Sequence, residues 1–193
     1  MDFDFSDEQV QLRDVVARYL GDHYSFERYR AIKTSAAGWD PAVWRGLADL
    51  GVLGLTVPAA QGGLGFGPLE TLAMMGDCGR NLLLEPMLSS AVIATAALRP
   101  FVADTAAALL LTDMAAGEKI AVLAHFESGA RFDSRWVTTR ARRVGEGYRL
   151  EGHKGVVMHA GAADRLLVSA RTAGEPGDAA GVSMFLVPRT AAG

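Results

Sequence analysis

The stretch that decides the fold is residues 121–164, AVLAHFESGARFDSRWVTTRARRVGEGYRLEGHKGVVMHAGAAD. Turn-forming residues such as Gly145 and Gly147 divide it into short apolar or alternating runs. Such runs, separated by glycine-bearing turns, are typical of antiparallel β-hairpins. We therefore predict that a β-domain begins here, with strand segments at residues 120–123, 136–140, 148–150 and 156–158.

Helical patterns precede this stretch. The clearest has Asp40 as its N-cap, Pro41 in its first turn and Gly51 just beyond its end, which together place one helix between them. Ser6, followed three residues later by Gln9, forms a capping box that begins the first helix. The remaining helices are predicted at residues 26–33, 68–80, 89–98 and 104–114.

Strand patterns follow the central stretch, at residues 165–170 and 182–187, with a loop of Gly, Pro, Ala and acidic residues between them. The sequence therefore predicts an α+β chain, with an all-α domain over residues 1–118 and part of a β-domain over residues 119–193. Because two or three hairpins cannot close a barrel, the β-domain is predicted to be partial.

The helix predicted over residues 68–80 is apolar on much of its surface. We expect its buried side to carry Leu69, Leu72, Ala73, Met75 and Gly76. The pair Met74-Met75 could form an adaptable acyl-binding surface, but core filling is the favoured interpretation. Cys78, the single cysteine, is predicted to lie on a buried face and is not expected to be a catalytic thiol.

A glycine-rich loop, residues 61–67, precedes that helix and raises the question of phosphate binding. We reject the dinucleotide fingerprint, because Glu70 stands where its third glycine should be and the parallel βαβ context is missing from the pattern. The alternative is a structural loop whose glycines allow positive φ and close packing. The structural interpretation is favoured.

The 193 residues are 50% hydrophobic and 21% charged, with a formal net charge of −3, an ordinary composition for one large or two small domains. This charge balance gives no footprint for nucleic acid or an anionic membrane, so neither is expected as a partner. The apolar runs are far shorter than a membrane span and the acidic start has no apolar signal segment, so we expect a cytoplasmic location. No histidine pair has metal-ligand spacing with a carboxylate, so no metal site is predicted.

The central stretch resembles the start of the middle domain of the acyl-CoA dehydrogenase family, flavoenzymes that desaturate acyl-CoA thioesters. The family pattern is roughly (Y/F)-x-x-T-E-P-x-x-G-S-D, a threonine-rich strand, a glycine turn, Y-x-L-x-G-x-K-x-W-I-(S/T)-N-A and x-x-A-D. In order, the parts of this pattern are filled without a gap by residues 123–133, 138–141, 148–154 and 163–164. The opening helix and the loop over residues 58–65 resemble the same family.

The resemblance implies an all-α N-terminal domain followed by the first part of an antiparallel, barrel-like middle domain, with the family's C-terminal helical bundle absent from this chain. It also implies FAD as cofactor, an acyl-CoA substrate, a role in fatty acid metabolism, an electron-transfer acceptor and a homo- or hetero-oligomer. In most of the family the base glutamate lies in the C-terminal domain, so no catalytic residue is assigned here. The chain resembles divergent small subunits of heteromeric dehydrogenases, such as that of pimeloyl-CoA dehydrogenase.

By position, the resemblance implies flavin contacts from the two segments 123–132 and 156–158. The residues predicted to bind the cofactor are Leu123, His125, Phe126, Phe132, Val156, Val157 and Met158, with Phe132 also near the substrate. Glu127 fills the glutamate of T-E-P, which in the family belongs to the flavin-side loop and is not the base.

Four of these positions depart from the family pattern. Phe126 stands for a threonine, Phe132 for a serine, Val156 for a tryptophan and Met158 for a serine or threonine. Each hydrogen bond lost in this way costs about 0.5–1.5 kcal/mol. At about 1.4 kcal/mol per decade, several losses together predict that FAD binding is weakened about ten- to a thousand-fold.

Three functions remain open from the sequence. The first is FAD-dependent α,β-dehydrogenation of an acyl-CoA by this chain as a fragment or subunit, favoured by the unbroken motif spacing. The second is a non-catalytic partner subunit of a heteromeric dehydrogenase, favoured by the replaced tryptophan and hydroxyls. The third is a flavin-dependent monooxygenase relative on the same fold.

Other side chains of the stretch have two interpretations each. His125 could donate a hydrogen bond to an oxyanion in the site, or have no such role. Arg140, Arg142 and Arg143 could contact the phosphates of CoA, although a solvated strand edge is the favoured account.

Overall fold

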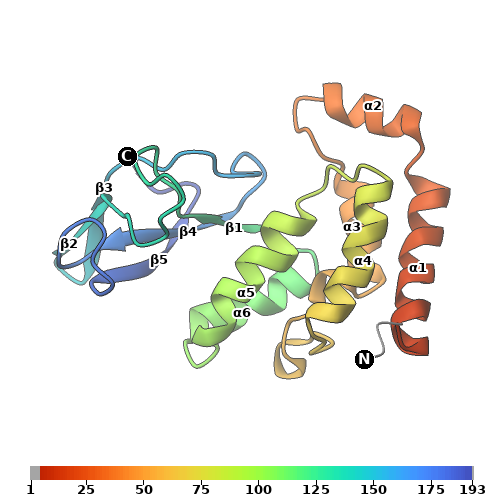
Figure 1. Cartoon of the computed structure of the whole chain (residues 1–193), viewed down its shortest axis with the longest axis horizontal. Helices are drawn as coiled ribbons and strands as arrows, with labels where there is room; N and C mark the ends of the chain where they lie inside the picture. The colour runs from red at the N-terminus through yellow and green to blue at the C-terminus, as the bar shows by residue number, and fades with distance from the viewer. Residues whose placement is uncertain (1–4, 193) are drawn as a thin grey trace. The chain divides into compact units, whose positions relative to one another are not determined.

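The computed structural model describes residues 5–192, which form two compact units (Figure 1). The first unit ends at Ile120 and contains α1 (Asp7–His23), α2 (Phe26–Thr34), α3 (Pro41–Asp49), α4 (Pro68–Arg80), α5 (Thr95–Leu98) and α6 (Thr105–Ala115). Its shorter helical segments are η1 (Val52–Gly54), η2 (Ala59–Gln61), the π-helical η3 (Met87–Ala94) and η4 (Arg99–Phe101). The second unit begins at Ala121 and contains β1 (Ala121–Ala124), β2 (Arg140–Val144), β3 (Gly147–Glu151), β4 (Arg165–Arg171) and β5 (Val182–Pro188). The predicted α+β class, with helices before strands, is confirmed.

The ends of the helices follow the predicted capping signals. Ser6 and Gln9 form a reciprocal capping box at the start of α1, with Gln9 N donating to Ser6 Oγ (3.3 Å) and Ser6 N donating to Gln9 Oε1 (3.0 Å). Asp40 Oδ1 accepts from Ala42 N (2.8 Å) at the start of α3, and Gly51 is left-handed just after its end (φ 76°). Both helix boundaries are therefore confirmed. Within residues 5–192, no helix combines the length and the apolar composition needed to cross a bilayer.

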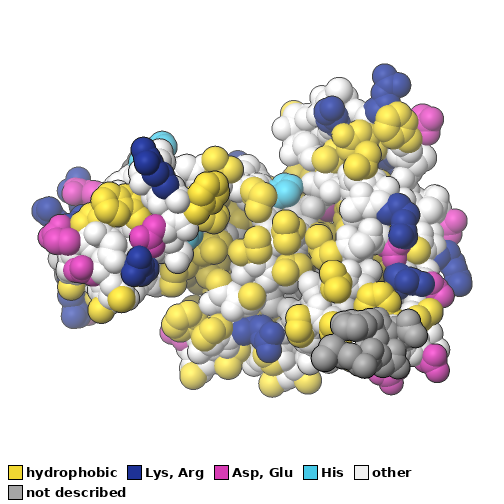
Figure 2. Space-filling view, in the orientation of Figure 1, with side chains coloured by type: hydrophobic (Ala, Val, Ile, Leu, Met, Phe, Trp, Pro, Cys, Tyr) yellow, Lys and Arg dark blue, Asp and Glu magenta, His cyan; other side chains and the backbone are white. Residues whose placement is uncertain are grey.

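The buried face of α4 differs from the predicted one. Leu69 and Leu72 are 57% and 62% exposed, Gly76 is exposed and Met75 is half-buried, so the prediction is wrong for most of this face. Because apolar residues occur all around α4, their spacing does not determine which side faces the core. The side that is buried in the unit, where α4 packs along α1, carries Ala73, Met74, Asp77 and Cys78. Figure 2 shows hydrophobic side chains gathered on the visible surface of the helical unit.

The glycine-rich loop before α4 is held by its own backbone. Leu64 N donates to Gly54 O (3.0 Å) and Gly65 N donates to Val57 O (2.9 Å). Gly63 lies so close to the Val57 carbonyl that a Cβ there would overlap it. These contacts support the structural interpretation of the loop, because its amides bond to the chain itself.

The sheet of the second unit is built on β4. β5 pairs antiparallel with β4 along its whole length, and β1 pairs parallel with its first four residues. β2 pairs parallel with the last residue of β4 and antiparallel with β3. The sheet is therefore mixed, whereas an antiparallel one was predicted. The long connection between β1 and β4, which carries the β2–β3 hairpin, gives the chain room to return in the same direction.

Two predicted strand segments are corrected by the structure. Residues 152–157 have no regular secondary structure and residues 158–160 form a turn, so the strand predicted at residues 156–158 is absent. The reason is the backbone of Val156, whose positive φ of 35° lies outside the β region. Of residues 136–140, only Arg140 belongs to a strand, at the start of β2.

Candidate functional site

The structure brings together the two segments in which flavin contacts are predicted. Gly155 N donates to Phe126 O (2.8 Å), which joins the loop after β1 to the segment that precedes Val156. Lys154 Nζ donates to His125 O (3.2 Å) and makes a second link between the same segments. His125 and Phe126 therefore lie beside the start of the 156–158 segment, as a shared site requires.

The remaining predicted residues take different environments. Leu123 is half-buried in β1, opposite Leu167 of β4. Val157 is also half-buried, and its carbonyl accepts from Ala160 N (3.3 Å). Phe132 follows Ala130 in a turn closed by Asp133 N donating to Ala130 O (2.8 Å), and its side chain is 99% exposed.

Glu127, in the first of the two segments, is buried, and both oxygens of its carboxylate accept hydrogen bonds. Its Oε2 accepts from Thr138 N (2.7 Å) and from Thr138 Oγ1. Its Oε1 accepts from Thr139 N (3.0 Å), Thr139 Oγ1 (2.6 Å) and Lys154 Nζ (2.7 Å). Burial alone would raise the pKa of Glu127, but the hydrogen bonds from Lys154, Thr138 and Thr139 outweigh it and hold the pKa far below its usual range. Glu127 is thus an ionised structural anchor.

Lys154 connects this anchor to the sheet. Its ammonium group is largely buried and donates to Glu127 Oε1 (2.7 Å), His125 O (3.2 Å) and Ser169 Oγ (3.0 Å). Ser169 is a fully buried residue of β4, and its Oγ also lies 2.9 Å from His125 Nδ1. A buried ion pair is stable when each member is also satisfied by hydrogen bonds, which is the case here. Lys154 and Ser169 were not predicted as parts of a site.

Arg171 is a second buried cation that sequence reasoning missed. It lies at the end of β4 and is 1% exposed. Its guanidinium donates to four backbone carbonyls: Arg135 O (2.9 Å), Val137 O (2.9 Å), Asp178 O (2.9 Å) and Ala180 O (2.8 Å). It therefore fixes the segment that leads into Thr138 and Thr139, the donors to Glu127. Its only sequence signal is an arginine closing the apolar run of residues 165–170.

The loops above this network have strained backbones. Arg131 (φ 45°), Phe132 (71°), Val156 (35°) and His159 (57°) have positive φ, and they are four of the five such residues other than glycine in the part of the chain that the structure describes. Positive φ is most costly for a β-branched residue such as Val156. Backbone strain of this kind clusters at functional sites.

The same loops expose large apolar side chains. Val156 is 87% exposed, Phe126 about half, and Met158 somewhat less. We call these three residues, which lie on the two joined loops, the apolar loop surface. Exposed apolar groups that adjoin one another mark surfaces that bind a ligand or a partner.

The three arginines of the β2 region are assigned to the surface. Arg140 donates to Gly174 O (2.7 Å) and to Glu175 Oε2 (3.2 Å), so its guanidinium already serves a loop contact. Arg142 and Arg143 are exposed on β2. This arrangement supports the solvated strand edge over phosphate binding for Arg140.

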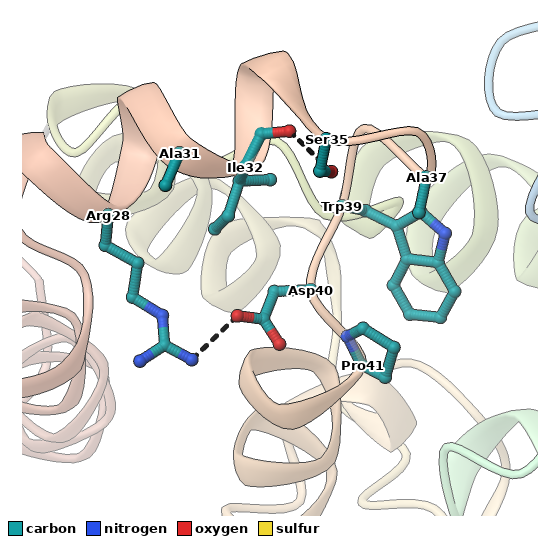
Figure 3. A pocket seen from close by; sticks show the side chains of 8 residues that line it. All are labelled: Arg28, Ala31, Ile32, Ser35, Ala37, Trp39, Asp40 and Pro41. Atoms are coloured by element: carbon teal, nitrogen blue, oxygen red, sulfur yellow. Dashed lines mark hydrogen bonds and ion pairs between the residues drawn. The ribbon is translucent and has the colours of Figure 1, made fainter.

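Two cavities lie away from the predicted site residues. One, of about 480 Å³, is lined by residues of α2 and the start of α3, and in it the Arg28 guanidinium pairs with Asp40 at 2.7 Å (Figure 3). The other, of about 1080 Å³, is lined mainly by β3 and β5. Among residues 5–192, no group of three or more His, Cys, Asp or Glu is placed to hold a metal ion.

Two family matches cover most of the chain. Residues 6–118 match the N-terminal domain of acyl-CoA dehydrogenases, and residues 122–193 match the middle domain. The chain therefore belongs to the acyl-CoA dehydrogenase family.

Individual relatives agree with this assignment. The acyl-CoA dehydrogenase FadE27 of Mycobacterium tuberculosis is 30% identical over 188 residues, which cover 97% of this chain and 47% of FadE27. A variant of the Tcur3481-Tcur3483 steroid ACAD has a TM-score of 0.82 at 30% identity, covering 95% of this chain and 48% of that one. The ChsE4-ChsE5 complex of Mycobacterium tuberculosis has a TM-score of 0.81 at 29% identity, covering 98% and 49%. The chain thus spans about half the length of the curated relatives it matches.

Proposed function

We propose that this chain contributes the flavin-side loops of an FAD-dependent acyl-CoA dehydrogenase, an oxidoreductase that forms a double bond between Cα and Cβ of an acyl-CoA thioester. The observation that carries the proposal is the joining of the loop after β1 to the 154–156 segment, through Gly155 N to Phe126 O and Lys154 Nζ to Glu127 Oε1. The joined loops display strained, apolar residues above a satisfied ionic network, as expected of a preorganised ligand surface.

The residues present fit a flat cofactor with an apolar face and a polar edge. Phe126, Val156 and Met158 would contact the face of the isoalloxazine ring, because they are the exposed apolar groups of the joined loops. The backbone of residues 123–132 would hold the polar edge. When bound, FAD supplies the acceptor for the β-hydrogen of the thioester.

Glu127 is not suited to remove the α-proton of the substrate. Both oxygens of Glu127 are occupied by donors from Thr138, Thr139 and Lys154, and its pKa is far below its usual range. A carboxylate held in this way is a poor proton acceptor, since accepting a proton would break these bonds. The proposed function therefore assigns this chain flavin binding and positioning, and it gives Glu127 no role as the base.

A second candidate is a partner subunit that binds flavin weakly and completes the site of another chain. The replaced side chains favour it, because Phe126 and Met158 have no hydroxyl to donate to a flavin. Two structural relatives, Tcur3481-Tcur3483 and ChsE4-ChsE5, are each named as a pair of components. Under this candidate the chain works in a hetero-oligomer, and FAD is retained only when the partner is present.

The test is the absorbance spectrum of the chain purified alone and after co-expression with a candidate partner subunit of the same family. Flavin bands in the lone chain support the first candidate, and bands only in the complex support the second. Val156→Asp should weaken FAD binding about tenfold or more, because it places a charge on an apolar contact. Asp accepts positive φ more readily than Val, so the variant is expected to fold.

Val144→Asp is the matched control, since Val144 is 61% exposed on β2, in the same unit and outside the joined loops. It should leave FAD binding unchanged. No flavin in either the lone chain or the complex would overturn both candidates.

A further inference from the structure

We propose that Ser169 and Lys154 are positioning residues that fix the His125 imidazole as a hydrogen-bond donor, with its proton on Nε2, for an acceptor atom on the isoalloxazine ring. The choice of ligand rests on the proposed function. The choice of tautomer rests on the hydrogen bonds of this chain alone.

The argument begins with Lys154, which can only donate. Its three protons have three acceptors: Glu127 Oε1 (2.7 Å), His125 O (3.2 Å) and Ser169 Oγ (3.0 Å). Ser169 Oγ therefore accepts a hydrogen bond from Lys154, and its own hydroxyl cannot donate back to the ammonium group.

The Ser169 hydroxyl still has one proton to place, and the residue is fully buried on β4. The one acceptor found within reach of Ser169 Oγ among the described residues is His125 Nδ1, at 2.9 Å. A buried hydroxyl that donates to nothing is costly. The arrangement that satisfies every group has Ser169 donating to Nδ1, so Nδ1 carries no proton and Nε2 carries it.

The imidazole is also fixed in place by its own main chain. His125 O accepts from Lys154 Nζ, and the next carbonyl, Phe126 O, accepts from Gly155 N (2.8 Å). The His125 ring meets the exposed Phe126 ring edge-on, with 5.7 Å between centroids, so it borders the apolar loop surface. An oriented N–H at the border of an apolar surface is the usual way to fix the direction of a bound ring.

The position of this donor gives it a role. The family pattern has a threonine hydroxyl at position 126, which is Phe126 in this chain. A histidine one residue earlier, held as an Nε2–H donor, supplies a polar contact next to the one that is lost. Flavin binding would then depend on residue 125 in this chain.

The tautomer is tested by long-range ¹H–¹⁵N NMR. The chain is labelled with ¹⁵N-histidine, and the spectrum is recorded without flavin at a pH at which imidazoles are neutral. His125→Gln identifies the His125 signals among the four histidines. The parent chain should show Nε2 protonated, and Ser169→Ala should shift His125 toward a mixture of tautomers. Ser183→Ala is the matched control on β5, because the Ser183 hydroxyl faces Thr172 Oγ1 (3.5 Å). This variant should leave the tautomer of His125 unchanged. A proton on Nδ1 in the parent would overturn the proposal.

The ligand is tested by FAD titration. Gln can place an N–H near the position of Nε2, so His125→Gln should bind FAD nearly as well as the parent, whereas His125→Leu should lose about tenfold, equivalent to about 1.4 kcal/mol. Equal affinity of the Leu variant and the parent would overturn the donor role. If the parent binds no FAD either alone or in the complex with its partner subunit, the proposed function and the donor role fail together, while the NMR result still decides whether Ser169 sets the tautomer.

Discussion

Arg171 N donates to Thr139 O at 2.7 Å, which ties the end of β4 to one of the residues that coordinate Glu127. The side chain of Arg171 holds the preceding carbonyls of Arg135 and Val137. Arg171 therefore holds the segment whose threonines donate to Glu127, while Lys154, the second buried cation, donates to Glu127 Oε1 itself. The geometry of the Glu127 site is consequently set by residues far from it in sequence.

The first prediction concerns Arg171. Arg171→Met should destabilise the second unit by about 3 kcal/mol, because it removes the guanidinium that donates to four backbone carbonyls, and a hydrogen bond of this kind contributes about 0.5–1.5 kcal/mol. Denaturant unfolding followed by the fluorescence of Trp136, the one tryptophan after residue 120, measures the change. Arg149→Met is the control, since Arg149 is largely exposed, and should stay within about 0.5 kcal/mol of the parent. Equal stability of both variants would contradict the structural role of Arg171.

The second prediction concerns Glu127 and low pH. Glu127→Gln removes the partner of the buried Lys154 ammonium and should cost the second unit about 3 kcal/mol at neutral pH. Because the folded state lowers the pKa of Glu127, its contribution is present above the unfolded value of about 4.3 and is lost as the pH falls toward the folded value. The gap between parent and variant in free energy of unfolding should therefore narrow below about pH 4. If this difference in free energy of unfolding stays constant down to the acid transition, the charge of Glu127 does not contribute to stability.

The third prediction concerns Glu85, for which the pH dependence of stability is opposite to that of Glu127. Burial raises the pKa of Glu85, whose Oε1 accepts from Asp40 N (3.2 Å). A carboxyl group with a raised pKa in the folded state contributes fully to stability below its unfolded pKa of about 4.3, and this contribution is lost as the pH rises through its folded pKa. Glu85→Gln should therefore make the first unit more stable than the parent above neutral pH, with the gain disappearing toward about pH 4. Trp39 and Trp44 fluorescence reports this unit, and Glu118→Gln, at an exposed position, is the control.

The fourth prediction concerns the glycine-rich loop. Gly63→Val should lower the thermal stability of the first unit, because any Cβ would overlap the Val57 carbonyl. Expressed as free energies, the loss of stability should exceed the change in FAD binding. Gly62→Ala is a milder comparison at a position with open space but positive φ (77°), and should cost about 1 kcal/mol. Calorimetry and FAD titration of the same samples separate the two effects. Normal thermal stability of Gly63→Val would contradict the assignment of the loop to backbone geometry.

The parts of the fold that could be predicted are those fixed by local signals. Ser6, Asp40 and Gly51 mark helix ends because a cap requires only neighbouring residues. The face of α4 could not be predicted, since Leu69 and Met74 are both apolar and only the packing decides which is buried. The strand predicted at residues 156–158 was wrong because the left-handed backbone of Val156 overrides its β-propensity.

The candidate site was predictable only in outline. The motif spacing indicated which two segments should meet, and Gly155 N to Phe126 O joins them. Lys154 and Ser169 were missed because their partners lie 15 to 44 residues away, and no local pattern distinguishes a buried lysine or serine from an exposed one. Which of the predicted residues contact flavin stays a prediction.

The burial of Cys78 has a practical consequence. Its Sγ lies 3.6 Å from Met74 Sδ inside the first unit, and burial raises the pKa of the thiol to about 12, so the folded protein presents almost no thiolate to a modifying reagent. It is also the single cysteine of the chain. The rate at which the unmodified protein reacts with a thiol reagent therefore reports how often the helical unit opens around Cys78.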